Sequence, residues 1–506
     1  MVVHYVALRV ETNDYSTNTN HAHLIDHIYA TNTDRVVNVD VPDLAISDHN
    51  PITCTLSVKI SKPKQKQHTS ILYRSFKKFN ADNFLSDLHK LSWYDVYNCT
   101  CPDAALDTWK TLFLEVLDKH APLRRKRVKQ STLPPWLTPD IKIAMALRDK
   151  LKREKKFDDY KRQRNLVKYL VRAAKKSYFK QFIADKRDTA SIWKALNMIT
   201  KGKSVSTIPA DLTADKFNTY FLSSAEQLAQ STQSNNSSPY TIPDCLKHHC
   251  QSRRPSAQFT IPLMTVAEVG RYISSAPKKP STGLDSISND LLKISLPYIV
   301  EPLTFIFNLC ISSGKFPASL KQAKVIPIPK GQDHNNLSNF RPISVLSSLS
   351  KPLERHVHKH LLEFLEQNSL LSVSQSGFRP KHSCHSALTR IVEKWLSSVN
   401  NNLLSGAVFL DMQKAFDLVD HDILLKKLEA YHLDQSVLKF FHSYLQLREQ
   451  KVYVHGQFSR NGHVRYGVPQ GSILGPLLFI LFINDLPLHV SGDNVDCDLF
   501  ADDAGG

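Results

Sequence analysis

Two apolar, β-rich runs of this sequence end directly in acidic residues. Residues 406–410 lead into Asp411, and residues 497–501 lead into Asp502 and Asp503. A buried carboxylate is costly without a cation, so each strand end predicts a positively charged partner. Three carboxylates at two strand ends can hold two Mg²⁺ ions, as in in-line phosphoryl transfer. The alternative is that Asp502 and Asp503 form an ordinary turn, which a bare Asp-Asp pair does more often.

The chain of 506 residues is several times longer than a typical domain, so it predicts several domains. Its shares of hydrophobic (42%) and charged (22%) residues exclude whole-chain disorder, collagen and coiled coil. Eight scattered cysteines form no disulfide framework, and no charged-then-apolar leader follows Met1. We therefore expect an intracellular, reduced protein.

The longest apolar stretch covers residues 473–483 and contains Gly475 and Pro476. It is too short to span a bilayer and instead predicts a buried helix. No membrane partner is expected.

The formal net charge of +18 is concentrated in one part of the chain. Residues 124–187 hold 22 Lys and Arg against 6 Asp and Glu, a net charge of +16. Such a block favours a polyanionic partner through phosphate neutralisation, although a solvated helical face is about equally common. The candidate nucleic-acid-binding residues are Arg124, Arg125, Lys126, Arg127, Lys175 and Lys176.

Apolar periodicity predicts helices over residues 80–120 and, after Pro134-Pro135-Trp136, a long basic helical region. In that region one face is apolar and the other carries Lys and Arg, with the apolar stripe made of Val167, Leu170, Val171, Ala174, Tyr178 and Phe182. From about residue 259 onward, strands at 323–328 and 407–410 mix with helices at 352–366 and 423–431. This mixture predicts an α+β fold.

Five motifs follow one another along the C-terminal half. They are Phe340-Arg341-Pro342-Ile343-Ser344, Gln375-Ser376-Gly377-Phe378-Arg379, Asp411-Met412-Gln413-Lys414-Ala415-Phe416-Asp417, Gly467-Val468-Pro469-Gln470-Gly471-Ser472 with Gly475-Pro476, and Phe500-Ala501-Asp502-Asp503. The set, in this order, resembles the reverse transcriptases of LINE-type (non-LTR) retrotransposons. Five ordered motifs are far more specific than any one of them.

The resemblance implies an RNA-directed DNA polymerase that uses two Mg²⁺ ions, with Mn²⁺ as the alternative. Asp411 and Asp502 would coordinate the ions, with Asp503 beside them. The ions would activate the primer 3′ hydroxyl and stabilise the pyrophosphate leaving group. The substrates would be an RNA template, a DNA primer and deoxynucleoside triphosphates.

The resemblance also implies a nucleotide-binding set. Arg341 matches the arginine that clamps the triphosphate, and Lys330 is a second phosphate contact for which Lys324 competes. Phe416 matches the aromatic steric gate against a ribose 2′ hydroxyl, and its alternative is a core aromatic. Gln470 and Gly471 would meet the template-paired nucleotide, since glycine allows close backbone approach.

A second resemblance covers about 60 residues at the N-terminus. Residues 24–28 (Leu-Ile-Asp-His-Ile) and 47–52 (Ser-Asp-His-Asn-Pro-Ile) are similar to the end of an apurinic-type endonuclease domain. This implies that Asp26 orients His49, while Asp48 positions the nucleophile or metal. The metal-binding glutamate, the catalytic tyrosine and the Asp-x-Asn motif of that family are missing, so we expect no DNA nicking.

The expected domains are an endonuclease remnant (residues 1–60, α/β sandwich), a helical basic connector (61–255) and reverse transcriptase fingers with a partial palm (256–506). We expect a chain truncated at both ends, because only three residues follow Asp503 and the catalytic hairpin needs a returning strand of usual length. The alternative function is a non-catalytic, nucleic-acid-binding remnant of a retroelement. As a retroelement ribonucleoprotein it would occupy cytoplasm and nucleus, and the sequence sets no oligomeric state.

Apart from His49, no motif singles out any of the 22 histidines. Residues 245–250 (Cys-Leu-Lys-His-His-Cys) have zinc-ligand types but no second paired cluster at the usual spacing. No zinc site is expected at residues 245–250.

Overall fold

The computed structural model of the chain describes residues 6–8, 28–30, 36–40, 53–56, 70–127, 134, 136–184, 193, 208–209, 211–233, 240–278, 281–331, 333–490, 492 and 495–505. The chain divides into two compact units, Met1–His68 and Thr69–Gly506. In the first unit β1 (Val6–Leu8) pairs antiparallel with β2 (Ile28–Ala30), and β3 (Val36–Asp40) pairs antiparallel with β4 (Thr53–Leu56).

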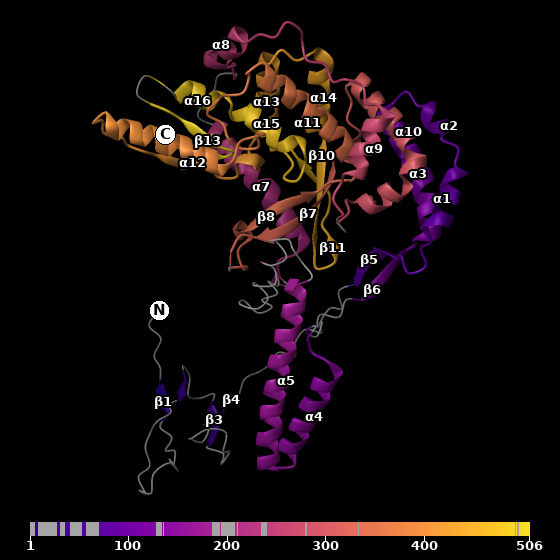
Figure 1. The fold of residues 1–506 in the computed structure, drawn as a ribbon, viewed down its shortest axis with the longest axis vertical. Coiled ribbons are helices and arrows are strands. Elements are labelled where there is room, and N and C mark those ends of the chain that lie inside the picture. The colour runs from indigo at the N-terminus through magenta and orange to yellow at the C-terminus, as the bar shows by residue number, and fades with distance from the viewer. Residues whose placement is uncertain are drawn as a thin grey trace. The chain divides into compact units, whose positions relative to one another are not determined.

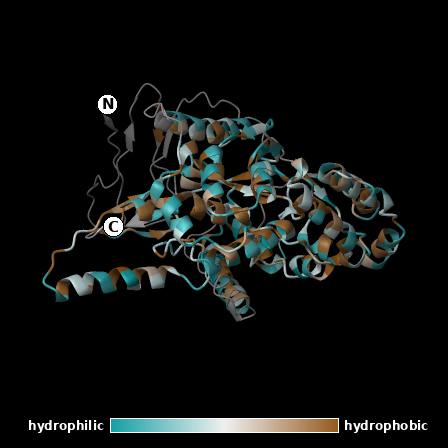
Figure 2. Ribbon diagram, turned by 90° about the horizontal axis from the view of Figure 1, so that it is seen from above, coloured by the Kyte–Doolittle hydropathy of each residue, from teal (hydrophilic) through white to brown (hydrophobic). Residues whose placement is uncertain are grey.

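The second unit is mainly helical, and hydrophobic and hydrophilic residues alternate along most of its helices (Figure 2). Its helices are α1 (Ala81–His89), α2 (Tyr94–Tyr97), α3 (Pro102–His120), α4 (Pro139–Arg153), α5 (Phe157–Ala184), α7 (Ala214–Gln233), α8 (Asp244–Ser252), α9 (Val266–Ser274), α10 (Asn289–Ser313), α11 (Ser350–Gln367), α12 (Cys384–Asn400), α13 (His421–Ala430), α14 (Gln435–Leu445), α15 (Leu474–Ile483) and α16 (Asp485–Val490), with 3₁₀ turns η2 (Ala318–Leu320), η3 (Leu337–Asn339) and η4 (Ala415–Asp417).

One hydrophobic core joins α1 and α3 to the helices of the C-terminal half. Phe84 of α1 and Trp109 of α3 belong to the same buried cluster as Phe307 of α10 and Phe479 of α15. The expected boundary at residues 255/256 therefore does not separate two cores, because the apolar faces of α1 and α3 pack on α10. The predicted buried helix at 473–483 is confirmed as α15.

Among the described residues, α10 is the one helix long and apolar enough to cross a membrane. Half of its apolar stretch is buried within the protein, and Leu303 and Phe307 are fully buried in the core. A core helix passes the same test of length and composition.

Residues 124–127, expected within a helical connector, lie on a strand. β6 (Leu123–Arg127) pairs antiparallel with β5 (Ser70–Arg74), which places Arg124 opposite Tyr73 and Arg125 opposite Leu72. The helical character expected of the connector does not extend to these residues. Their partner strand lies about 50 residues earlier in the chain, beyond the reach of local periodicity.

The basic helices follow as the pair α4 and α5, which lie side by side and are called here the basic helix pair (Figure 1). The predicted stripe is confirmed, since Val167 is buried and Leu170 is half-buried, whereas Lys175 and Lys176 are exposed. The side-chain amide of Gln163 on α5 donates to the Ala144 carbonyl on α4 at 3.1 Å.

A five-stranded sheet supports the first of the five motifs. Its order is β11-β10-β7-β8, with β12 also paired to β10, and α7 packs against β10 and β12. The strands are β7 (Gln322–Pro329), β8 (Phe340–Val345), β10 (Arg448–Val454), β11 (Gln457–Phe458) and β12 (Gly462–Val464). β7 and β10 run parallel, and β7 and β8 run antiparallel.

A three-stranded sheet of order β13-β14-β9, here called the aspartate sheet, carries the predicted acidic residues. It consists of β13 (Asp498–Phe500), β14 (Asp503–Gly505) and β9 (Phe409–Asp411). The expectation that the hairpin lacks its returning strand is wrong. β14 has only three residues, but it pairs antiparallel with a neighbour on each side.

Candidate active site

The aspartate sheet brings the three predicted carboxylate residues together. Asp503 on β14 is the direct antiparallel partner of Asp411 on β9, and Asp502 lies in the turn just before β14. Directly opposite residues project from the same face, with Cβ atoms about 5 Å apart. Two carboxylates from separate strands therefore share one face, next to a third.

The expectation that Asp411 is a buried carboxylate is wrong, because β9 is exposed. Phe409 is 70% exposed, Leu410 is 60% exposed, and Asp411 is exposed as well. Asp503 is also exposed and Asp502 is half-buried. The carboxylates are accessible to ions from solvent, and like-charge proximity takes the place of burial as the reason to expect a cation.

The segment 375–379 cradles the turn that carries Asp502. The side-chain oxygen of Gln375 accepts hydrogen bonds from the amides of Gly377 (2.7 Å) and Ala501 (3.0 Å). A side chain at Gly377 would place its Cβ 2.2 Å from the Ala501 nitrogen, so only glycine fits. Ala501 itself has a left-handed backbone (φ +59°), a conformation that these contacts hold in place.

Arginine side chains fix this cradle and the hairpin to neighbouring helices. Arg379 forms a two-pronged pair with Glu366 of α11, at 2.9 and 2.7 Å. Arg390 and Lys394 of α12 pair with buried Asp498 at the start of β13, at 2.6 and 3.1 Å. The aspartate sheet is thus anchored on two sides.

Phe416 packs against two other aromatic rings. It stacks on Phe479 of α15 at a centroid distance of 4.4 Å and meets Phe378 edge-on at 5.9 Å. Its side chain remains half-exposed. The ring is therefore held in one orientation while part of it faces outward.

The segment 467–472 docks on β8 through its backbone. The Ser344 amide donates to the Gln470 carbonyl at 2.9 Å, and a Cβ at Gly471 would lie 2.4 Å from the Ser344 carbonyl oxygen. With φ at +121°, Gly471 also has a backbone that other residues rarely adopt. The approach of motif to strand therefore requires glycine here.

Asp417 is a site residue that the sequence reasoning did not single out. Its Oδ1 accepts a hydrogen bond from the Gln470 side-chain amide at 2.8 Å, which ties the Asp411–Asp417 motif to the Gln470 motif. Burial raises the pKa of Asp417, while Gln470, Lys414 and Lys330 act in the opposite direction. Burial also lowers the pKa of Lys414. The sequence signal that could have indicated Asp417 was the pair of charged residues, Lys414 and Asp417, within the Asp411–Asp417 motif.

Arg341 and Lys330 are exposed and have side chains available to an anion. Neither side chain forms a hydrogen bond or ion pair with another residue that the structure describes. Lys324, the competitor of Lys330, instead lies over the Tyr453 ring at 4.4 Å, and burial lowers its pKa. No contact among the described residues joins Arg341 to the aspartates.

The basic candidates occupy two separate elements. Arg124 and Arg125 are exposed on β6, whereas Lys175 and Lys176 are exposed on α5. The Lys175 Nζ lies 4.7 Å from the centre of the Trp136 ring. Lys126 and Arg127 continue β6. The endonuclease candidates Asp26, Asp48 and His49 lie outside the described residues.

Comparison with known proteins shows which family the segment carrying this site is similar to. Residues 328–504 match the family of reverse transcriptases (RNA-dependent DNA polymerases). This range holds all five motifs, the aspartate sheet except Gly505, and the Gly471 contact with β8. The segment that carries the site is therefore similar to reverse transcriptases.

The relatives belong to mobile elements. The chain is 37% identical to the probable RNA-directed DNA polymerase from transposon BS of Drosophila melanogaster, over 46% of this chain and 26% of the relative. It is 28% identical to the RNA-directed DNA polymerase from mobile element jockey of the same fly, over 89% of this chain and 50% of the relative. With the probable RNA-directed DNA polymerase from transposon X-element of Drosophila melanogaster it shares 33% identity, over 44% of this chain and 24% of the relative.

These relatives confirm the resemblance to non-LTR retrotransposon reverse transcriptases that the five motifs predicted. The chain spans half or less of the length of each of these curated relatives. The endonuclease resemblance remains a prediction.

Proposed function

We propose that this chain provides the active site of an RNA-directed DNA polymerase of a non-LTR retrotransposon. Its substrates are an RNA template, a DNA primer and deoxynucleoside triphosphates. The observation that carries the proposal is the direct pairing of Asp411 with Asp503, beside Asp502, inside the matched domain. Carboxylates on one exposed face suit two-metal nucleotidyl transfer.

The donor set fits two Mg²⁺ ions, with Mn²⁺ as the alternative, because both ions prefer carboxylate oxygens. Asp411 and Asp502 would be the ligands, and Asp503 completes the acidic face. When bound, such ions supply activation of the primer 3′ hydroxyl and charge stabilisation of the pyrophosphate. The protein's own contribution is to hold Asp411 and Asp503 opposite each other on adjacent strands, with Asp502 in the turn before Asp503, before the substrates arrive.

Other residues bind the incoming nucleotide. The guanidinium of Arg341 and the ammonium of Lys330 hold the triphosphate, since both side chains are exposed and form no hydrogen bond within the described chain. The charge of Lys330 also acts on Asp417. Gln470 and Gly471 contact the template-paired nucleotide from the segment docked on β8. Phe416 acts as the steric gate, because its stacking on Phe479 keeps the ring from turning aside.

The basic candidates grip the phosphate backbone. Lys175 and Lys176 project from the exposed face of α5, and Arg124 and Arg125 from β6, with Lys126 and Arg127 next to them. Such contacts are independent of sequence and weaken as salt increases. The proposed regions are an endonuclease remnant without nicking activity (1–60), a basic connector (61–255), and fingers with a partial palm (256–506). The last two regions share one hydrophobic core. The protein would act in a ribonucleoprotein of cytoplasm and nucleus.

The test is extension of a primed poly(A) template with dTTP in Mg²⁺. We expect incorporation by the unaltered chain and a loss of at least roughly 10³-fold in Asp411→Asn, since several kcal/mol of transition-state stabilisation disappear. Asp422→Asn is the matched control, because Asp422 is an exposed aspartate of α13 within the same matched range and outside the acidic face. Failure of the unaltered chain to extend, with RNA binding retained, would favour the non-catalytic remnant.

A further inference from the structure

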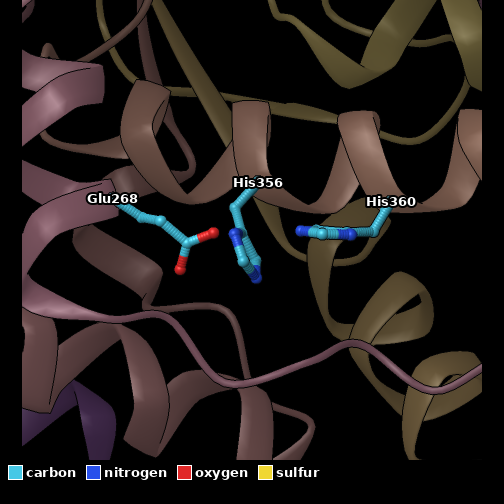
Figure 3. A group of neighbouring side chains, drawn as sticks. All are labelled: Glu268, His356 and His360. Atoms are coloured by element: carbon cyan, nitrogen blue, oxygen red, sulfur yellow. The ribbon is translucent and has the colours of Figure 1, made fainter.

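Glu268, His356 and His360 form a cluster away from the aspartate sheet. Glu268 lies in the first turn of α9, and the two histidines lie one turn apart on α11 (Figure 3). One ligand atom from each residue lies within 4.8 Å of the other two. Figure 3 shows the three side chains pointing toward a common space between the helices.

His356 presents a lone pair that nothing else in the described chain uses. The residue is fully buried, and its Nε2 donates to the Pro262 carbonyl at 2.7 Å. That hydrogen bond leaves the proton on Nε2 and the lone pair on Nδ1. Nδ1 is itself buried and has no hydrogen-bond partner. An unpaired buried acceptor is costly, so its retention needs a reason.

His360 repeats this arrangement with the opposite nitrogen. Its Nε2 is buried without a hydrogen-bond partner, while its Nδ1 lies 3.6 Å from a carboxylate oxygen of Glu363. The two imidazole rings are 4.5 Å apart, at an angle of 62°. In metal sites a ligand histidine commonly turns its second nitrogen to a backbone carbonyl or a carboxylate. Pro262 and Glu363 supply these two kinds of partner.

Glu268 is held in place by the start of its own helix. Its Oε2 accepts hydrogen bonds from the Thr265 amide (3.0 Å) and hydroxyl (2.9 Å). The Glu268 amide donates in return to the Thr265 hydroxyl oxygen at 3.3 Å, which completes a capping box. Within the described residues its other oxygen accepts no hydrogen bond. The carboxylate is thus fixed beside the imidazoles with one oxygen available.

We propose that Glu268, His356 and His360 bind one Zn²⁺ ion. Two imidazoles and a carboxylate are an established zinc ligand set, with water as the fourth ligand, whereas Mg²⁺ and Ca²⁺ prefer oxygen alone. Ligand atoms around a tetrahedral zinc lie about 3.4 Å apart, so these ligand atoms approach one another by up to about 1.4 Å on binding. The ion joins α9 to α11 and is independent of the proposed polymerase chemistry.

The cluster was outside the reach of sequence reasoning, since Glu268 and His356 are nearly 90 residues apart. Residues 245–250, which carry zinc-ligand types, instead form α8. There the His249 Nε2 is bonded to the Leu370 carbonyl at 3.1 Å. The described part of the chain gathers no metal-ligand group from that segment.

The test is titration of the metal-free full chain with Zn²⁺ against a chromophoric chelator. We expect the unaltered chain to bind one Zn²⁺ ion tightly. In both His360→Gln and Glu268→Gln the affinity for this ion should be at least about 100-fold weaker. Glu268→Gln is informative because glutamine preserves the capping box and removes only the charge. His358→Gln, on the same helix between the two histidines, is the matched control and should retain the ion.

A second readout is thermal unfolding, in which Zn²⁺ should raise the midpoint of the unaltered chain and of His358→Gln only. Unchanged zinc stoichiometry in both ligand variants would overturn the proposal. So would the absence of zinc binding by the unaltered chain.

Discussion

The aspartate sheet and the basic helix pair are both charged, but they are held in different ways. The turn before Asp502 is fixed by Gln375, which lies 126 residues away from Ala501 in the chain. The basic helix pair is joined by a local contact, from Gln163 to Ala144, across 19 residues. Chemistry at carboxylates needs positions set by distant parts of the fold, whereas a grip on phosphates needs only an exposed row of charge.

The aspartates and the lysines also differ in the structures that surround them. Carboxylates of the aspartate sheet depend on glycines, buried ion pairs and a left-handed turn. Lys175 and Lys176 project from the open face of a helix whose other face packs on α4. Small structural changes should therefore impair nucleotide incorporation well before they impair binding.

Gly377→Ala should produce the largest separation of the two properties. The new Cβ would meet backbone atoms of Ala501 at 2.2 to 2.7 Å, so the turn carrying Asp502 must shift. We expect incorporation to fall roughly 100-fold, because overpacking of this kind costs about 1–3 kcal/mol. RNA binding should change less than about twofold. Single-nucleotide incorporation and filter binding measure the two effects.

The matched control is Gly406→Ala, because a Cβ there meets nothing within 4 Å and the residue precedes β9. It should leave both properties unchanged. Equal incorporation by Gly377→Ala and Gly406→Ala would contradict the assigned role of the cradle.

Glu354→Gln should have a smaller effect, on the stability of the region that holds the aspartate sheet and the Gln470 motif. This buried carboxylate accepts hydrogen bonds from the Ser350 hydroxyl (2.8 Å) and from the Ile473 amide (2.8 Å), where α15 starts after the Gln470 motif. A glutamine side chain has only one acceptor oxygen, and its NH₂ group would face one of these two donors. The lost hydrogen bond should lower the free energy of unfolding by about 1–3 kcal/mol. Urea unfolding should show this loss, and Glu429→Gln, at an exposed glutamate of α13, should not.

The smallest expected effect is a pH dependence confined to the polymerase side. Burial lowers the pKa of His421, whose Nε2 donates to the Gly467 carbonyl at 2.8 Å. In the unfolded chain this histidine takes up a proton below about pH 6.5, which the folded state resists. Its contribution is therefore complete above that pH and is lost as the pH falls, by about 1.4 kcal/mol at most over one pH unit.

Unfolding midpoints measured between neutral and mildly acidic pH should fall less steeply in His421→Gln than in the unaltered chain. The basic helix pair contains no histidine, so RNA binding by its lysines should not follow this transition. An unchanged slope in the variant would rule out His421 as its source.

Much of the fold was accessible from local patterns. The amphipathic stripe around Val167, the buried helix at 473–483 and the strand at 323–328 all follow from periodicity, and the structure contains them. The order of five motifs also predicted the reverse transcriptase domain that the comparisons support. Each helix, strand or single motif among these features depends on residues close together in the chain.

The remaining features depend on long-range pairing. Arg124 and Arg125 join a strand only because residues 70–74 supply a partner. β14, with only three residues, pairs with a neighbour on each edge, and these neighbours come from residues 498–500 and 409–411. The bond from Gln470 to Asp417 and the cluster of Glu268 with His356 likewise join distant segments. No local pattern contains that information.

The most direct measurement compares incorporation and RNA binding in two variants of the full chain. Asp502→Asn should lose incorporation by at least roughly 10³-fold and bind RNA within about twofold of the unaltered chain. The double variant Lys175→Gln/Lys176→Gln should lower the salt dependence of binding by up to about two phosphate contacts and retain incorporation at saturating RNA. Loss of both properties together in either variant, or undiminished incorporation by Asp502→Asn, would contradict the separation of chemistry from grip.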